Sequence, residues 1–373
     1  MATAQGSLRD TRHRRLVVVC AVTALAAVGA SGCSQDAADE QPSQGVVVNL
    51  GGEIAVLKGI DGKPEIVGQR PDGTETLDTY RLTAPRQLNT GDIVGIRDGG
   101  AVAISPDDPV KATLLGQATA WFPSVDKGKV WTVTEQTAAA CEGQGLPTTV
   151  RAKYTIAEHE TSGRPARRVV SMPCGIEPAA QTSQGIVAHQ TTGDVPGSGN
   201  ASRARTSVVL LDKNGAVSSV VAEAATVLAA DADQVVWRAD ECPTGTCTKI
   251  YDAQAKKSRN APACEAGDPV GTGTLAPGGR WYATAVRADN GTHLAVLDLG
   301  ENSCRDLGAF AALDKTTDLD ESLAATWSRA NLLMIDQGTG ELIEHNAPTG
   351  RVERRREALP VTNGAQVWGA HNA

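Results

Sequence analysis

The sequence has few aromatic residues, no excess of basic residues and no apolar run long enough to cross a membrane. Trp, Tyr and Phe make up 3% of the 373 residues, and 35 Lys and Arg stand against 43 Asp and Glu. The longest uncharged apolar run, residues 16–30, is shorter than the about 20 residues of a spanning helix. The formal charge of −8 argues against a nucleic-acid partner. The 41% apolar content excludes a wholly disordered chain.

The first 33 residues have the order of an export signal. Residues 1–15 carry four Arg and one Asp, residues 16–30 are apolar, and Ser31 and Gly32 precede Cys33. A basic segment, a short apolar segment and small residues are typical of a secretory signal. The small residues before Cys33 resemble the lipobox of bacterial lipoproteins, although Ala30 stands where that family has a larger aliphatic residue. The resemblance implies removal of residues 1–32 as a signal peptide and attachment of lipid to Cys33.

Two alternatives to lipidation remain open, an uncleaved anchor and an ordinary signal with an incidental Cys33. Residues 34–45 are polar and acidic, so residues 33–45 are predicted to be a lipidated Cys followed by a flexible tether. Removal of the signal lowers the 35 basic and 43 acidic residues to 31 and 42, and the charge falls from −8 to −11. An anionic bilayer does not attract such a body. We therefore expect acylated Cys33 to hold the chain to the lipid bilayer on the extracytoplasmic face of the cell membrane.

The cysteines are consistent with export. The signal contains Cys20, and Cys33 takes the lipid, which leaves six: Cys141, Cys174, Cys242, Cys247, Cys264 and Cys304. An even number in an exported domain predicts disulfides, with fifteen possible connectivities. Pairing of neighbours along the chain gives Cys141–Cys174, Cys242–Cys247 and Cys264–Cys304. Their spacing is not that of a zinc module, so no metal site is predicted.

Short runs rich in Val, Thr and Ala, separated by Gly, Asp, Asn and Pro, predict strands joined by tight turns from residue 46 onward. Residues 220–230 fit either a helix or two buried strands. Apolar or Trp-containing runs recur at 54–56, 93–95, 130–131, 186–188, 236–237, 281–282, 327 and 367–368. Repeats of about 40–50 residues with several strands each are typical of a β-propeller. We therefore predict an all-β fold for residues 46–373, with about seven four-stranded blades.

The two ends of the predicted propeller are expected to share a blade. Trp368 lies close to the C-terminus, so its strand should pair with residues 46–50 and leave no exposed sheet edge. The run Leu-Ala-Pro-Gly-Gly-Arg-Trp-Tyr-Ala at 275–283 resembles the Ser-Pro-Asp-Gly type of strand start in TolB-like and WD40-like propellers. Ala and Gly replace Ser and Asp, and only this repeat shows the pattern clearly. The alternative fold is a pair of β-sandwich domains.

No catalytic, cofactor-binding or metal-binding residues are predicted. The five histidines beyond the signal have no metalloprotease spacing, and the sequence has neither a Gly-x-Ser-x-Gly elbow nor a phosphate loop. We expect these histidines, and the cluster of Arg351, Arg354, Arg355 and Arg356, to face water. Residues 314–321 are acidic but lack the order of a calcium loop. Asp231 and Asp233 are interpreted as turn residues.

The preferred function is a non-enzymatic binding scaffold with a protein, peptide or glycan partner at one end of the ring, because loops on a rigid fold often bind ligands. The first alternative is a hydrolase or lyase with its site at the channel. Catalytic groups from separate blades leave no local motif, so the question of an enzyme stays open. Charged side chains that converge at the channel mouth would favour it. The second alternative is a structural subunit of the cell envelope.

Overall fold

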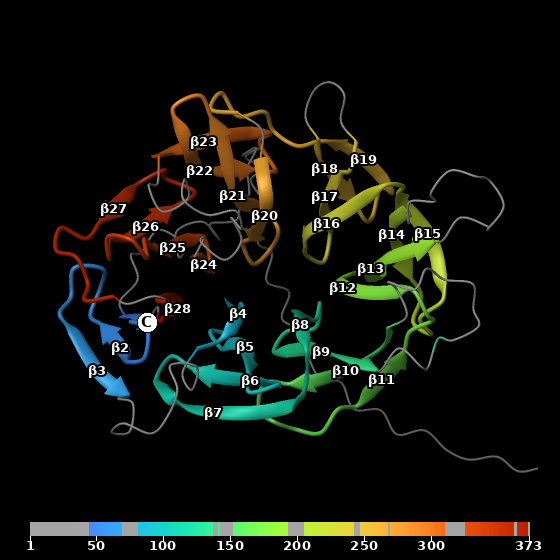
Figure 1. The fold of residues 1–373 in the computed structure, drawn as a ribbon, viewed down its shortest axis with the longest axis horizontal. Coiled ribbons are helices and arrows are strands. Elements are labelled where there is room, and N and C mark those ends of the chain that lie inside the picture. Colours follow the sequence, from blue (N-terminus) through green and yellow to red (C-terminus); the bar gives the residue numbers. More distant parts are fainter. Residues whose placement is uncertain are drawn as a thin grey trace, which may run out of the picture. The chain divides into compact units, whose positions relative to one another are not determined.

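The computed structural model describes residues 45–68, 81–136, 141, 152–192, 205–241, 247–267, 269–309, 325–361 and 364–371. These residues form 28 strands and no helix (Figure 1). In consequence, no described segment is a helix that could cross a membrane. Cys33, the signal, the tether up to residue 44 and the acidic stretch 314–321 lie outside the described residues.

The strands in chain order are β1 (Gly45–Asn49), β2 (Ile54–Leu57), β3 (Pro64–Gly68), β4 (Thr83–Gln87), β5 (Ile93–Arg97), β6 (Gly100–Ser105), β7 (Asp108–Gln117), β8 (Ala120–Pro123), β9 (Lys129–Gln136), β10 (Lys153–Glu160), β11 (Arg168–Ser171), β12 (Ile176–Thr182), β13 (Gly185–Thr192), β14 (Arg205–Leu211), β15 (Val217–Ala222), β16 (Ala225–Ala230), β17 (Gln234–Ala239), β18 (Thr248–Asp252), β19 (Lys257–Asn260), β20 (Pro269–Leu275), β21 (Trp281–Ala288), β22 (Gly291–Asp298), β23 (Ser303–Ala309), β24 (Ala325–Ser328), β25 (Asn331–Ile335), β26 (Leu342–Asn346), β27 (Val352–Arg354) and β28 (Gln366–His371).

The strands form seven antiparallel sheets of four, arranged as the blades of a ring (Figure 1). Blade 1 has the order β28-β1-β2-β3, and blades 2 to 7 each take four consecutive strands, from β4–β7 to β24–β27. The first strand of each blade lies nearest the centre in Figure 1. The prediction of a propeller with about seven blades is confirmed, and the alternative of two β-sandwich domains is wrong.

Blade 1 closes the ring as the position of Trp368 predicts. Strand β28 pairs antiparallel with β1, with Gly45 opposite His371 and Val47 opposite Gly369. Gln87 of blade 2 clamps this strand, because its Nε2 donates to the Ala370 carbonyl at 2.6 Å and its Oε1 accepts from the Ala370 N–H at 3.0 Å. Closure therefore joins the first and last described strands to each other and to the next blade.

The core consists of seven apolar clusters, one at each junction between neighbouring blades. Trp131 lies between blades 3 and 4 and Trp368 between blades 1 and 2, both fully buried. The Trp residues do not lie on the same strand in every blade. Trp237 lies on the second strand of blade 5, whereas Trp327 lies on the first strand of blade 7. Either position faces a neighbouring blade, so the Trp spacing varies while the blade repeat holds.

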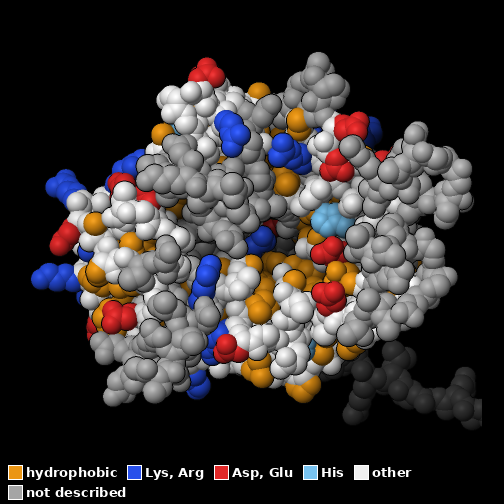
Figure 2. Space-filling model, in the orientation of Figure 1, with side chains coloured by type: hydrophobic (Ala, Val, Ile, Leu, Met, Phe, Trp, Pro, Cys, Tyr) orange, Lys and Arg blue, Asp and Glu red, His pale blue; other side chains and the backbone are white. Residues whose placement is uncertain are grey.

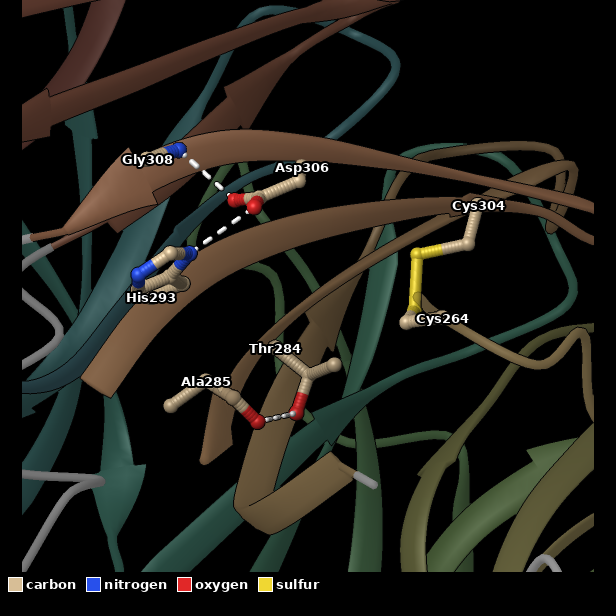
Figure 3. The surroundings of a disulfide bond; sticks show 7 residues. All are labelled: Cys264, Thr284, Ala285, His293, Cys304, Asp306 and Gly308. Carbon is tan, nitrogen blue, oxygen red and sulfur yellow. Dashed lines mark hydrogen bonds and ion pairs between the residues drawn. A yellow bond between two sulfur atoms is a disulfide. The ribbon is translucent and has the colours of Figure 1, made fainter. Parts of the chain in front are cut away.

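Two disulfides, Cys141–Cys174 and Cys264–Cys304, join the pairs that neighbour pairing predicts (the second is drawn in Figure 3). Cys247 is also disulfide-bonded, and its predicted partner Cys242 lies outside the described residues. The cysteines of the first pair are 33 residues apart and those of the second 40, so both bonds restrict long segments of the unfolded chain.

The ambiguous segment 220–230 forms strands. It contains the end of β15 and the whole of β16, and the turn between them places Ala224 at a φ of 47°. The buried residues of β16 divide between two core clusters: Ala225 and Val227 pack against blade 4, and Leu228 and Ala229 pack against blade 6.

The expectation that the histidines face water is wrong for His159, His293 and His345, which are at most 8% exposed. Each lies on the third strand of its blade, and neighbouring blades cover both faces of such a strand. The expectation is also wrong for Arg355. This side chain is buried and donates to the carbonyls of Ile60 and Gly62, so it ties blade 7 to blade 1.

Candidate functional site

A cavity of about 320 Å³ lies where the inner strands of six blades end. Its walls come from the ends of β4, β8, β12, β16, β20 and β24 and from the turns that follow: residues 86–89, 123–126, 128–129, 181, 230–233, 274–278 and 326–327. Because these segments come from blades 2 to 7, the cavity lies at one mouth of the central channel. Figure 2, which views the ring along the direction of Figure 1, shows Lys or Arg side chains at the hollow near its centre.

Arg86 is the cation of this cavity. It lies near the end of β4, directly after Pro85, and is half-buried. Burial lowers the pKa of Arg86, and the nearby Tyr282 of blade 6 acts in the opposite direction. Among the residues that the structure describes, none forms an ion pair or a hydrogen bond with its guanidinium. Arginine remains charged in proteins, so the cavity contains a cation that the described residues do not neutralise.

Asp231 is the half-buried anion of the cavity, in the turn after β16. Its Oδ2 accepts from the Gly278 N–H at 2.9 Å, and its Oδ1 accepts from the N–H of Ala232. Burial raises the pKa of Asp231 although both backbone bonds act to lower it, and the neighbouring Asp233 also raises it. No described cation forms an ion pair with this carboxylate, so its charge is also uncompensated within the described part of the chain.

Two glycines allow this contact between blades 5 and 6. Gly278 and Gly279 adopt φ values of 87° and 72°, which side-chain-bearing residues rarely adopt. A Cβ on Gly279 would lie 3.3 Å from the Cβ of Asp231. The Pro-Gly-Gly turn that resembles a propeller strand start therefore brings a backbone N–H to the carboxylate.

The other charged groups of the cavity have side-chain partners. Lys129 lies 2.6 Å from Asp126 and 3.8 Å from Glu158, and the hydrogen bond to Asp126 raises the pKa of Lys129. Asp233 is exposed and accepts from the Gln254 side chain at 2.9 Å. The other ionised groups of the cavity walls form ion pairs or hydrogen bonds with described side chains. Arg86 and Asp231 do not.

One wall of the cavity is apolar. Trp327 of blade 7 is buried, and its indole N–H donates to the Thr274 carbonyl of blade 6 at 2.9 Å. Leu275 and Pro277 continue this wall. Such a surface contacts the carbon atoms of a ligand and keeps water from its charged groups, which strengthens their electrostatic interactions.

A smaller cavity of about 220 Å³ shares residues 87–89 with the first. It is lined by the turn after β4, the turn after β6 and the end of β28, including His371. His371 lies 3.1 Å from Asp107 across this cavity. The hollowed region thus extends along blade 2 to the closing strand of blade 1.

A histidine and an aspartate also meet away from the cavity. Nδ1 of His293 on β22 lies 2.8 Å from Oδ2 of Asp306 on β23, and Oδ1 of Asp306 accepts from the Gly308 N–H at 2.8 Å (Figure 3). Within the described residues, Nε2 of His293 is buried without a partner. The structure describes no group of three or more His, Cys, Asp or Glu side chains that could hold a metal ion. The pair joins the third and fourth strands of blade 6.

Sequence reasoning did not find Arg86 and treated Asp231 only as a turn residue. Asp231 does lie in a turn, but the turn faces the cavity. The useful signal was positional, because most of the lining residues lie at the end of the first strand of a repeat or directly after it. A comparison of polar residues at that position in successive repeats would have selected both side chains.

No protein-family model matches the sequence, and no curated protein sequence is similar to it. Solved structures are similar in fold. An acylaminoacyl peptidase from Pyrococcus horikoshii aligns with a TM-score of 0.52 and 11% identity over 81% of this chain and 47% of the peptidase. A puromycin-hydrolysing peptidase from Mycobacterium tuberculosis aligns with a TM-score of 0.45 and 17% identity, over 82% of this chain and 49% of its own. The shared feature is the propeller fold. The chain spans about half the length of either peptidase.

Proposed function

We propose that this chain is a lipoprotein on the extracytoplasmic face of a bacterial cell membrane, and that its propeller binds a small ligand without converting it. The binding part of the proposal rests on Arg86, a cation without an ionic partner among the described residues, in a cavity built by six blades. The basic and apolar segments before Cys33 support the lipid anchor. The net charge of −11 keeps the folded body from binding an anionic bilayer, so the lipid is the proposed means of attachment.

The cavity favours a small ligand over a protein or a long glycan. Its volume of about 320 Å³ falls within the range of small-molecule sites, and it combines an apolar wall with few charged groups. A site of this kind selects a ligand by its charged groups and contacts the rest of it through van der Waals packing. Of the three partner classes expected from the sequence, a peptide fits the cavity best.

Substitution Cys33→Ala tests the anchor. The variant should lose incorporation of a radioactive fatty acid and move out of the membrane fraction, because the thiol that accepts the lipid is gone. Cys20→Ala, in the apolar part of the signal, is the matched control and should keep both properties. Labelling of the Cys33→Ala variant at the wild-type level would refute lipidation at this residue.

The second candidate is the hydrolase or lyase that the sequence leaves open. Asp231 favours it, since a half-buried carboxyl with a raised pKa beside a second carboxylate can act as a general acid. Against it, both Asp231 oxygens accept backbone bonds and Asp233 accepts from Gln254, so both carboxylates also serve the turn. Mass spectrometry of peptides and oligosaccharides incubated with the full chain separates the two functions. Cleavage products that disappear with Asp231→Asn would establish the enzyme.

A further inference from the structure

Two opposite charges in the channel-mouth cavity have no ionic partner among the described residues and are not paired with each other. Arg86 comes from blade 2 and Asp231 from blade 5, and no ion pair joins them. Desolvation disfavours each charge, as the directions of both pKa shifts show. Lys129 in the same cavity is neutralised in the usual way, because the carboxylates of Asp126 and Glu158 lie within 4 Å of its ammonium group. Charges that are withdrawn from water in native proteins are usually paired, so two opposite charges with no ionic partner among the described residues point to a ligand that supplies the partners.

We infer that the cavity binds a small zwitterion of the size of a dipeptide, with its carboxylate on Arg86 and its ammonium group on Asp231. The inference rests on the proposed binding function and names the ligand class. A carboxylate accepts two parallel N–H bonds from a guanidinium, which a neutral group cannot reproduce. Asp231 uses one acceptor site on each oxygen for the backbone bonds, and a carboxylate has about four such sites in all. Two sites therefore remain for an ammonium group.

The size of the cavity and its apolar wall agree with this ligand. A volume of about 320 Å³ holds about ten water molecules at about 30 Å³ each. Dialanine, with about eleven non-hydrogen atoms, is smaller than this volume and therefore fits inside the cavity. Its methyl groups can contact the wall formed by Trp327, Leu275 and Pro277. The two charges come from separate blades, so we expect a ligand that bridges them to hold its ammonium and carboxylate farther apart than a free α-amino acid does.

The test uses four probes and three variants of the full chain, purified in detergent, with dissociation constants from calorimetry. The probes are dialanine, its C-terminal amide, its N-acetyl derivative and free alanine. The variants are Arg86→Gln, Asp231→Asn and the control Arg97→Gln. Arg97 lies at the end of β5 in the same blade as Arg86, outside the cavity, and no described residue forms an ion pair with it.

Wild type and Arg97→Gln should bind dialanine at least tenfold more tightly than either derivative, because each derivative loses one charge-assisted contact. Arg86→Gln should bind dialanine and its amide equally, and Asp231→Asn should bind dialanine and its N-acetyl form equally. Free alanine should bind more weakly than dialanine because it cannot span the two charges. Binding of dialanine that neither cavity substitution weakens, or no binding to wild type, would overturn the inference.

Thermal unfolding separates a ligand contact from a structural role. Removal of an unpaired, desolvated charge relieves its cost, so Arg86→Gln should melt at or above the wild-type temperature. A lower melting temperature would show that Arg86 supports the fold. If dialanine does not bind but membrane-derived protein still holds another small molecule through Arg86, the zwitterion inference fails and the binding function stands. If neither ligand is found, both fail.

Discussion

Replacing Trp368 with alanine is expected to lower the free energy of unfolding by about 3–5 kcal/mol. The side chain is fully buried among Val47, Ile93 and other residues of blades 1 and 2, so truncation leaves a cavity that its neighbours only partly fill. Its indole N–H also donates to Oε1 of Gln366 at 3.1 Å. Through Nε2, Gln366 donates to the Leu82 carbonyl at 2.7 Å. The substitution therefore weakens the packing and the hydrogen bonds that join the closing strand to blade 2.

Chemical denaturation of the full chain measures this loss, and Trp121→Ala is the matched control. Trp121 is only half-buried, and its N–H donates to the Ala84 carbonyl, so its truncation should cost clearly less. Equal losses for the two variants would show that closure of the ring by β28 contributes nothing beyond the burial of a Trp side chain.

Lowering the pH from 7 to 5 should destabilise the chain by about 2 kcal/mol through His345 alone, and by about 3 kcal/mol at pH 4. Burial and, to a smaller extent, the nearby Arg305 lower the pKa of His345 to about 4, against an opposing contribution from the Arg351 backbone. The unfolded chain binds the proton below a pKa of about 6.5, whereas the folded chain does not until about pH 4. The loss therefore begins near pH 6.5 and ends near pH 4.

The difference between wild type and His345→Leu isolates this contribution, because burial also lowers the pKa of His159 and His189. The variant should lose about 2 kcal/mol less than wild type between pH 7 and pH 5. His371→Leu is the control for the loss of a histidine at an exposed position, since its side chain is 49% exposed. An unchanged pH dependence in His345→Leu would mean that the imidazole is protonated within the fold.

The sequence predicts much of the fold because every blade of a propeller must meet the same physical requirements. Each blade needs apolar residues on both faces of its strands, so short Val-rich and Ala-rich runs recur and the turns between them carry Gly, Asn and Asp. The position of Trp368 near the chain end predicts closure for the same reason. The burial of Arg355 and His345 could not be predicted, because it depends on which neighbouring blade covers each side chain.

The candidate site was less predictable than the fold. Arg86 and Asp231 are 145 positions apart and meet in one cavity only because inner strands of different blades end at the same mouth of the channel. No spacing rule relates residues on separate blades, so motif searches return nothing. The character of Arg86 as an unpaired cation depends on the absence of described carboxylates around it, which only coordinates reveal.

Native mass spectrometry of the full chain, released gently from its membranes, tests most directly whether the channel-mouth cavity binds a small ligand. We predict that wild type and Arg97→Gln carry one bound small molecule, and that Arg86→Gln is observed without it. The same measurement reports the lipid on Cys33 as a mass increment that all three proteins share. Identical ligand occupancy in wild type and Arg86→Gln, or no bound molecule in any of them, would contradict the proposed binding site.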